Sequence, residues 1–491
     1  MRVFLPTLVF LFIFISSCIS KRDASQKNSE IHFTLNEMEL DAPIELVFFN
    51  NEYHLFYQYK KGLLSNWGHS KSSDLISWEH VPLSLISDSL KSIGSGSVVV
   101  DWNNTCGLGN ENPPMLAFFI TDANFEKEEN RQSVSLAFSI DFGKTWEKSI
   151  YPIVLGSVSN GILDLQVIWH EERQSWIMMV LTEYDLYFLS SEDMINWSYE
   201  NKFNDRDNLR VGIWSQVCFF PIQVEESNKQ KWVLLMSSEA GSPNGGSGIQ
   251  YFIGDFDGHS FDQIQTKQSW LDNGSDNFAG VCLSSHLDLS KPLFYLAMIT
   301  NRIYESRFDT IKSRTTYTLP RMLTLVERKN EYFLYSNPIQ VSEGKPKKIA
   351  ETKISGILGI TKNIKIPLEI NLMFDVSNKY HFNFAESLGI QLSSENGNQI
   401  IIGYNNRKHI FFISEQNPSH TLSEFYQARY LINTSSIGLK IIIDHSSLEL
   451  FALDGMISLT KKTFTSDEWH NVSLFSEKGE STLMWGNIIE K

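Results

Sequence analysis

A turn that recurs along the chain constrains the fold more than any other feature. In three close copies, an aspartate stands four or five residues before a tryptophan, at Asp74–Trp78, Asp141–Trp146 and Asp193–Trp197. A looser fourth copy, Asp257–Phe261, closes on phenylalanine. An aspartate in a turn can accept hydrogen bonds from backbone amides, and the closing aromatic ring can pack between neighbouring sheets. The recurrence therefore predicts one structural unit built several times.

Each repeated unit contains an apolar run rich in aromatic and β-branched residues, as expected of a buried strand. The aspartates of the four turns are 67, 52 and 64 residues apart. Such irregular spacing favours propeller blades with variable loops over a strict solenoid. Five runs predict five blades: 53–59, 115–121, 176–181, 232–237 and 293–299.

The distribution of tryptophan marks a second domain. Ten of the 12 tryptophans lie at or before Trp270, and the sequence texture changes after Leu323. A basic stretch at 342–348 follows, and then runs of alternating polar and apolar residues that are typical of an antiparallel sandwich. The sequence thus predicts an all-β protein, with a five-bladed β-propeller over residues 31–335 and a β-sandwich over residues 336–491.

The first residues resemble a bacterial export signal. A mostly apolar run after Arg2 is too short for a spanning helix and ends at Ile15-Ser16-Ser17-Cys18, which resembles a lipoprotein cleavage site. This resemblance implies a signal peptide over residues 1–17, acylation of Cys18 and a linker over residues 18–30. The alternative is an ordinary signal peptide with a chance cysteine. We expect an exported lipoprotein, periplasmic or at the cell surface, that meets the membrane only through its lipid.

Charge and cysteine content exclude several functional classes. The chain has 42 Lys+Arg and 57 Asp+Glu, a net charge of −15, so nucleic acid is not an expected partner. Besides Cys18, three scattered cysteines form no disulfide framework, and neither they nor the histidines have metal-ligand spacing. One bridge stays open as an alternative to inert buried thiols. We expect no metal and no cofactor.

Several longer motifs carry a family resemblance, and they occur in the family's order. Together they resemble glycoside hydrolase family 32, the invertase, levanase and inulinase family. The resemblance implies a five-bladed propeller with a funnel-shaped site, followed by a sandwich, and a fructan or fructosyl oligosaccharide as partner. The matching segments are 53–59, 67–69, 73–82, 95–97, 101–105, 241–258, 319–325 and 441–455.

The family cleaves β-fructosides with a nucleophilic carboxylate and an acid/base carboxylate that stand about 5–5.5 Å apart. Aligned without gaps, the nucleophile position is Ala42 and the acid/base position is Ser215. The third family carboxylate, which holds sugar hydroxyls in the transition state, is kept as Asp164 between Leu163 and Leu165. Burial between two leucines should raise the pKa of this carboxyl.

Residues that contact the sugar in the family are also mostly replaced. The segments 94–97 and 298–302 read Gly-Ser-Gly-Ser and Met-Ile-Thr-Asn-Arg, without the family's aromatic rings. Gln58 and Trp67 remain as candidate substrate-binding residues. Glu45 stands where the family has glycine, and we expect it to reshape the loop or to reach the mouth of the funnel.

A methyl group cannot attack an anomeric carbon, and a serine hydroxyl is a poor proton donor near neutral pH. We therefore interpret the chain as a catalytically impaired or inactive member that acts by binding carbohydrate. Two alternatives stay open: an active β-fructosidase, and a non-catalytic scaffold in a polysaccharide-uptake assembly.

Overall fold

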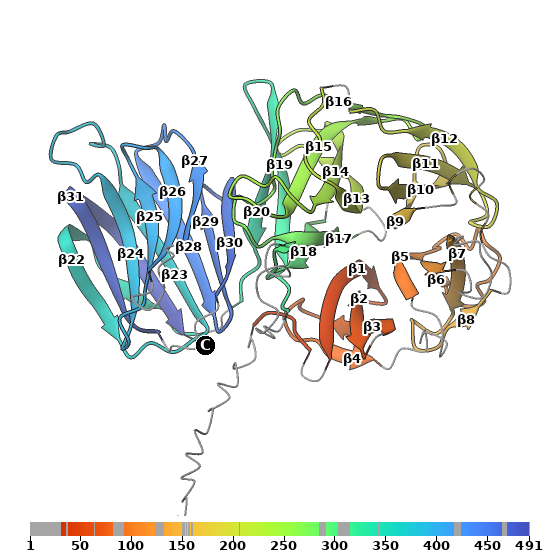
Figure 1. Cartoon of the computed structure of the whole chain (residues 1–491), viewed down its shortest axis with the longest axis horizontal. Helices are drawn as coiled ribbons and strands as arrows, with labels where there is room; N and C mark the ends of the chain where they lie inside the picture. The colour runs from red at the N-terminus through yellow and green to blue at the C-terminus, as the bar shows by residue number, and fades with distance from the viewer. Residues whose placement is uncertain are drawn as a thin grey trace, which may run out of the picture.

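The chain folds into a ring of small sheets beside one large sheet (Figure 1). The computed structural model describes residues 31–35, 38–62, 64–81, 93–122, 132–149, 153, 155, 158, 161–205, 207–283, 291–302, 315–341, 344–416, 424–463 and 469–490. Five four-stranded antiparallel sheets form a propeller, and an 11-stranded sheet follows it. The predicted fold class is confirmed. Within the described residues, no helix is long and apolar enough to span a membrane.

Each blade is a meander in which chain order equals spatial order. Blade 1 comprises β1 (Glu39–Phe49), β2 (Glu52–Lys61), β3 (Leu64–Ser72) and β4 (Glu79–Val81). Blade 2 comprises β5 (Ile93–Val100), β6 (Met115–Asp122), β7 (Gln132–Ser139) and β8 (Glu147–Lys148). Blade 3 comprises β9 (Ile162–His170), β10 (Ser175–Thr182), β11 (Leu186–Ser191) and β12 (Ser198–Lys202).

Blade 4 comprises β13 (Trp214–Gln223), β14 (Gln230–Ser238), β15 (Gly248–Phe256) and β16 (Phe261–Gln263). Blade 5 comprises β17 (Phe278–Cys282), β18 (Leu293–Met298), β19 (Arg321–Arg328) and β20 (Glu331–Pro338). The expected domain boundary at residue 335 falls inside β20, because its pairing with β19 continues to Pro338.

Apolar side chains between neighbouring blades close the ring. Separate buried clusters join blades 1 and 2, 2 and 3, 3 and 4, and 4 and 5. A further cluster joins blade 5 to blade 1, where Leu46 and Leu55 share a core with Phe278 and Leu296. The first strand of every blade faces the centre of the ring (Figure 1). These inner strands, β1, β5, β9, β13 and β17, each contact the inner strands of the two neighbouring blades.

The repeated turns have the geometry that the sequence predicts. In the first copy, the Oδ1 atom of Asp74 accepts hydrogen bonds from the backbone N–H groups of Ile76 and Ser77 at 2.8 and 2.7 Å. The indole of Trp78 donates to the carbonyl of Leu75 at 3.1 Å, which locks the turn. The turns at Asp141–Trp146 and Asp193–Trp197 repeat this pattern.

The second domain is one sheet folded over a continuous core. Its strands are β21 (Lys347–Ile349), β22 (Thr352–Lys362), β23 (Leu368–Asp375), β24 (Ser387–Ser394), β25 (Gln399–Asn405), β26 (Ile410–Gln416), β27 (Glu424–Arg429), β28 (Ser436–Asp444), β29 (Ser447–Ala452), β30 (Ile457–Lys462) and β31 (Trp469–Glu490). The long β31 pairs with β24 through its first half and with β23 through its second half. It therefore belongs to both layers of the sandwich, whose apolar residues fill the space between them.

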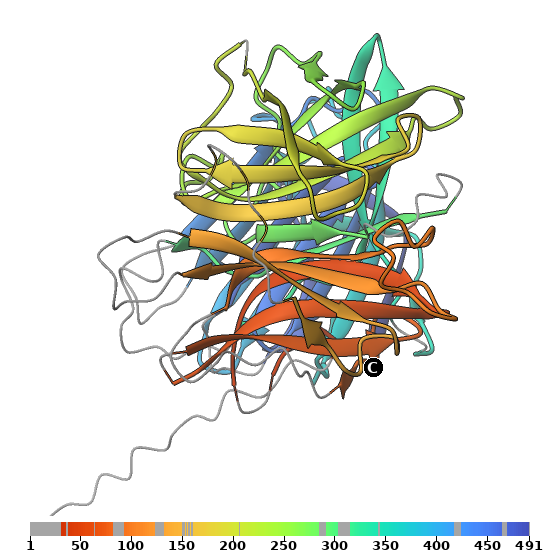
Figure 2. The same ribbon diagram turned by 90° about the vertical axis from the view of Figure 1, so that its right-hand side faces the viewer.

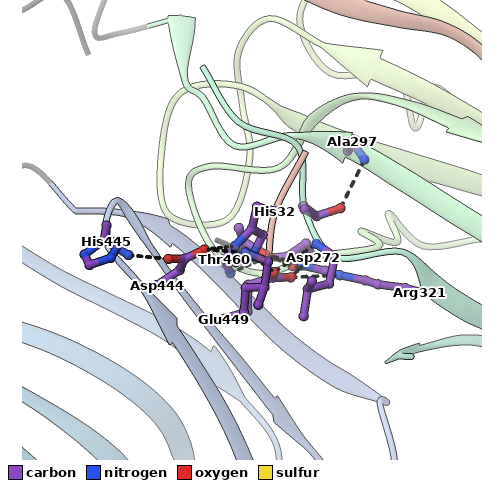
Figure 3. Close-up of polar contacts among 11 residues, drawn as sticks. His32, Asp272, Ala297, Arg321, Asp444, His445, Glu449 and Thr460 are labelled. Atoms are coloured by element: carbon purple, nitrogen blue, oxygen red, sulfur yellow. Dashed lines mark hydrogen bonds and ion pairs between the residues drawn. The ribbon is translucent and has the colours of Figure 1, made fainter. Parts of the chain in front are cut away.

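The sandwich lies against one side of the ring, behind the blades in the rotated view (Figure 2). A buried ion cluster joins the two domains (Figure 3). The guanidinium of Arg321, in β19, lies 2.8 Å from the carboxylate of Asp272 and 2.5 Å from that of Glu449 in β29. Arg321 is 0% exposed, so these carboxylates and the hydroxyl of Thr460 replace water around its charge.

His32, which precedes the first blade, extends the ion cluster. Its Nδ1 atom lies 2.8 Å from Asp444 and its Nε2 atom lies 2.9 Å from Glu449. Burial alone would lower the pKa of His32, but the hydrogen bonds and charges of both carboxylates outweigh it and raise the pKa to about 9. Burial would raise the pKa of Glu449, but the charges of Arg321 and His32 lower it to about 2. His32 and Glu449 are therefore both ionised near neutral pH.

We expect Glu449→Gln to lower the free energy of unfolding by about 3–5 kcal/mol, because removing one partner leaves Arg321 and His32 buried with too little countercharge. The matched control is Glu331→Gln, which removes an exposed ion pair with Lys267. The side chain of Lys267 is 78% exposed and that of Glu331 is 61% exposed. That pair is worth at most about 1 kcal/mol. Urea unfolding followed by tryptophan fluorescence measures both. Equal effects of the two substitutions would contradict the role assigned to the cluster.

Candidate functional site

The candidate site lies on the propeller axis, where the inner strands of the five blades meet. Ala42 is on β1, Asp164 is on β9 and Ser215 is on β13, so the structure brings three sequence-predicted positions to the centre of the ring. Hydrogen bonds between side chains and backbone connect these inner strands across blade boundaries. The axis is thus lined by polar groups, whereas the spaces between blades are apolar.

Asp164 bridges three blades. One carboxylate oxygen accepts a hydrogen bond from the hydroxyl of Ser95 on β5 at 2.5 Å, and the other accepts from the backbone N–H of Val217 on β13 at 2.8 Å. The residue is 2% exposed. Burial raises the pKa of Asp164 from 3.8 to about 7, although the hydrogen bonds from Ser95 and Val217 act to lower it. The raised pKa of Asp164 has the direction expected from the sequence. The carboxylate is surrounded by polar groups of the neighbouring strands as well as by the flanking leucines.

Ala42, the position predicted from the sequence to be that of the nucleophile, offers no reactive group. Ala42 is half-buried and packs at the edge of the core between blades 5 and 1. The neighbouring carboxylate of Asp41 accepts a hydrogen bond from the N–H of Ala42 at 3.0 Å and lies 3.5 Å from the ammonium of Lys60 on β2. Asp41 is thus held at the side of the blade by local contacts.

Ser215, the position predicted from the sequence to be that of the acid/base, has a hydroxyl that already makes a hydrogen bond. Ser215 is half-buried, and its Oγ donates to the carbonyl of Ser237 on β14 at 3.3 Å. The next residue, Gln216, donates through its side-chain amide to the carbonyl of Pro43 on β1 at 2.9 Å. This segment therefore connects blades 4 and 1 across the axis.

Glu45, expected either to reshape the loop or to reach the mouth of the funnel, is buried within the ring. It is 1% exposed, and its carboxylate accepts a hydrogen bond from the hydroxyl of Ser97 at 2.7 Å. Ser97 in turn accepts from the backbone N–H of Val167 at 3.2 Å. Ser97 is two residues further along β5 than Ser95, so this layer is about 7 Å from that of Asp164 along the strand. Glu45 thus joins the inner strands of blades 1, 2 and 3.

A weak signal in the sequence points to these layers. Ser95 and Ser97, like Asp164 and Gln166, stand two residues apart, so each pair lies on one side of its strand. Gln166 also joins two blades, because its side-chain amide oxygen accepts a hydrogen bond from the backbone N–H of Phe219 on β13 at 2.6 Å. Alternating polar residues inside otherwise apolar strands mark a polar axis, but they do not identify which strands meet.

The two expected sugar-binding residues lie side by side on blade 1, where Gln58 on β2 pairs with Trp67 on β3. Gln58 is half-buried. Trp67 is 1% exposed, and its indole donates to the carbonyl of Gly94 on β5 at 2.8 Å. A Cβ added at Gly96 would lie 2.9 Å from the ring of Trp67, so glycine there makes room for the indole. In this structure Trp67 supports β5 and offers little free surface to a ligand.

Apolar and cationic residues stand where the family has polar or aromatic ones. Leu163, predicted from the sequence to stand at the family's arginine position, is 38% exposed beside Asp164. Arg302 packs 5.1 Å over the ring of Phe278 and lies 3.9 Å from the carboxylate of Glu239. Side chains of other chemical types therefore occupy the space around the axis.

The axis offers neither a metal site nor a disulfide among the residues that the structure describes. No three His, Cys, Asp or Glu side chains are grouped so that they could hold a metal ion. Cys218 and Cys282 are buried thiols on β13 and β17, and Cys106 is a half-buried thiol. Cys18 and the predicted signal peptide and linker lie outside the described residues.

Comparisons with known proteins cover nearly the whole chain. Residues 32–338 match the family model for the N-terminal domain of glycosyl hydrolases family 32, and residues 341–488 match the model for its C-terminal domain. The chain is 29% identical over 475 residues to a levanase of Bacillus subtilis, covering 92% of this chain and 68% of that protein. It is 27% identical over 504 residues to an extracellular exo-inulinase of Aspergillus niger, covering 92% of each.

Solved structures agree with this likeness. The exo-inulinase from Aspergillus awamori has a TM-score of 0.83 at 25% identity, covering 94% of this chain and 98% of that one. A β-fructofuranosidase from Schwanniomyces occidentalis complexed with fructosyl-erythritol has a TM-score of 0.83 at 26% identity, covering 95% and 98%. The backbone of both domains is therefore shared with these proteins.

We expect Asp164→Asn to remove a pH dependence of stability. The folded-state pKa of Asp164 is raised, so its stabilising contribution is complete below pH 3.8 and is lost as pH rises through about 7. The stability of the variant relative to the unsubstituted protein should therefore increase, by on the order of 1–4 kcal/mol, between about pH 4 and about pH 8.

Denaturant unfolding across this pH range measures the effect. Asp193→Asn is the matched control, because turn hydrogen bonds lower the pKa of Asp193 below 3.8 despite partial burial, so its contribution changes only below about pH 4 and the stability difference of this variant should stay nearly constant across the range. A stability difference between Asp164→Asn and the unsubstituted protein that stays constant with pH would contradict the assignment.

Proposed function

Because the chain belongs to glycosyl hydrolase family 32, we propose that it binds β-fructosyl carbohydrate without hydrolysing it. The observation that carries this proposal is the pair of substitutions at the axis, Ala42 and Ser215, on a scaffold that otherwise follows the family. Retaining hydrolysis needs two carboxylates on either side of the scissile bond. Neither residue can supply one.

The surroundings of the axis support the same conclusion. Asp164 is the one family carboxylate kept, and both its oxygens are engaged by Ser95 and Val217. Glu45 is a second buried carboxylate, but it lies deeper along the axis and is bonded to Ser97. Catalytic groups act as a unit, and each general acid or base contributes about 10²-fold or more. One carboxylate without its partners therefore gives little acceleration.

The relatives support a fructosyl ligand. They include a levanase, exo-inulinases and a fructofuranosidase complexed with fructosyl-erythritol. A shared backbone positions a ligand of similar shape even where the reacting groups are replaced. The substrate class proposed for this chain is accordingly a fructan or a fructosyl oligosaccharide.

We further propose that the protein is exported and anchored by a lipid on Cys18, either in the periplasm or at the cell surface. The run that ends at Ile15-Ser16-Ser17-Cys18 supports this, and two of the relatives are named extracellular. Cys18→Ala should move the protein out of the membrane fraction or block its maturation, as followed by fractionation and intact-mass measurement. An unacylated mature protein that still sediments with membranes would contradict the anchor.

The main test is a comparison of binding and hydrolysis with the purified mature protein. We expect retention by levan or inulin in affinity electrophoresis, and no fructose released from sucrose, levan or inulin. Turnover at ordinary enzymatic rates, about 1 to 10³ per second, that survives repurification would overturn the proposal.

A variant in which both carboxylates are restored tests whether Ala42 and Ser215 stand at the family's nucleophile and acid/base positions. Ala42→Asp with Ser215→Glu rebuilds both carboxylates beside Asp164, and we expect feeble hydrolysis because Leu163 and Arg302 replace residues that orient the sugar. Each single variant should be inert. High activity from Ala42→Asp alone would show that another group already acts as the acid/base.

A further inference from the structure

The second site is a groove on the outer face of the sandwich, far along the chain from the propeller axis. It has a volume of about 690 Å³ and is lined by residues of β22, β24, β25, β26, β27 and the first half of β31. The opposite face of these strands packs into the sandwich core. The layer that carries the ion cluster, with Asp444, Glu449 and Thr460, is the other one. The groove therefore lies on the layer that does not hold this cluster.

The strand register aligns two buried glycines between two phenylalanines beneath the groove. Phe475 on β31 pairs with Gly389 on β24, which pairs with Gly403 on β25, which pairs with Phe412 on β26. Three steps between strands separate the two rings by about 14 Å. A Cβ at Gly389 or Gly403 would lie 2.1 Å from a backbone oxygen of the facing strand, so neither position admits a side chain.

Aromatic surface continues along the groove beyond this row. Phe425 on β27 is 48% exposed and stacks on Phe412, with ring centroids 5.7 Å apart and an interplanar angle of 21°. On the other wall, Ile357 of β22 is 67% exposed and pairs with Phe475. Each wall therefore presents a flat or branched apolar surface to the groove.

Uncharged polar side chains lie on both sides of this row of two glycines and two phenylalanines. On one side, the amide of Asn405 donates to the hydroxyl of Ser387 at 2.9 Å. On the other side, Gln391 and Ser414 line the groove, and their side chains have no hydrogen-bond partner in the part of the chain that the structure describes. Side-chain amides and hydroxyls can both donate and accept, which matches the hydroxyl groups of a sugar.

The charges at the groove balance. Its lining contains two acidic and two basic residues, Glu386, Glu477, Lys408 and Lys478. Glu386 lies 3.3 Å from Arg407 and 3.2 Å from Lys478, so its charge is paired at the rim. A groove without net charge has no basis for selecting a phosphorylated or strongly anionic ligand.

We propose that this groove binds a short stretch of a neutral oligosaccharide. The aromatic rings would stack on the C–H faces of the sugar rings, and Gln391 and Ser414 would bond their hydroxyls. A peptide strand fits less well, because the floor consists of paired central strands whose backbone groups have no free edge to offer. The proposal rests on the sandwich alone and stands apart from the function proposed for the axis.

The test uses affinity electrophoresis of the full mature protein in gels that contain inulin, levan or dextran, with polygalacturonate as the charged polymer. The variant is Gln391→Ala with Phe425→Ala, both at the groove surface. The matched control is Phe382→Ala, an 85% exposed ring elsewhere on the sandwich. Asp164→Asn reports on the axis. Thermal unfolding confirms that each variant folds.

We expect at least one neutral polymer to retard the protein and the groove variant to weaken that affinity by about tenfold, the loss of one stacking contact and one hydrogen bond. Phe382→Ala and Asp164→Asn should leave unchanged the part of the retardation that depends on the groove. Retardation that responds only to Asp164→Asn, or only to polygalacturonate, would overturn the proposal. So would a dimer in light scattering that Phe425→Ala dissociates while no polymer binds, since the occupant would then be a second copy.

Discussion

The buried cluster around Arg321 is the interaction on which the arrangement of the two domains depends. Its guanidinium links Asp272 of the propeller with Glu449 of the sandwich, and His32 adds a second cation between Glu449 and Asp444. Charges with no access to water are tolerated only where their partners are in place. The sandwich therefore has one docking position on the ring, and the segment before β1 is fixed by the same contacts.

The closed ring has a different requirement at its axis. Five inner strands converge there, and their polar side chains bond across blades, as Asp164 does with Ser95 and Val217. In an active family 32 enzyme the axis must hold reacting carboxylates in addition to closing the ring. Here Ala42 and Ser215 contribute packing and a local hydrogen bond, and the remaining carboxylates serve the connections between blades. Under the proposed function, the fold is kept while the chemistry of its centre is changed.

Two sites on one rigid chain would change how a carbohydrate polymer is held. A ligand that meets the axis of the propeller and the outer groove of the sandwich at once gains from the high effective concentration of the second site. The ion cluster keeps the two domains in a fixed relation, which favours this gain for a polymer of suitable reach. A lipid on Cys18 would hold such a protein at a membrane surface, where retention of polymer rather than its cleavage is useful.

The sequence by itself determined the blades and the sandwich, because these depend on local signals. Asp74 bonds groups two and three residues away, and strand alternation is read from neighbouring residues. Only the tertiary structure decided where the charges lie. Glu45 meets Ser97 52 residues away, and Arg321 meets Glu449 128 residues away, so nothing near either residue predicts its partner. Burial and pairing of such charges are set by which strands converge, and that convergence is a property of the closed ring and its docked sandwich.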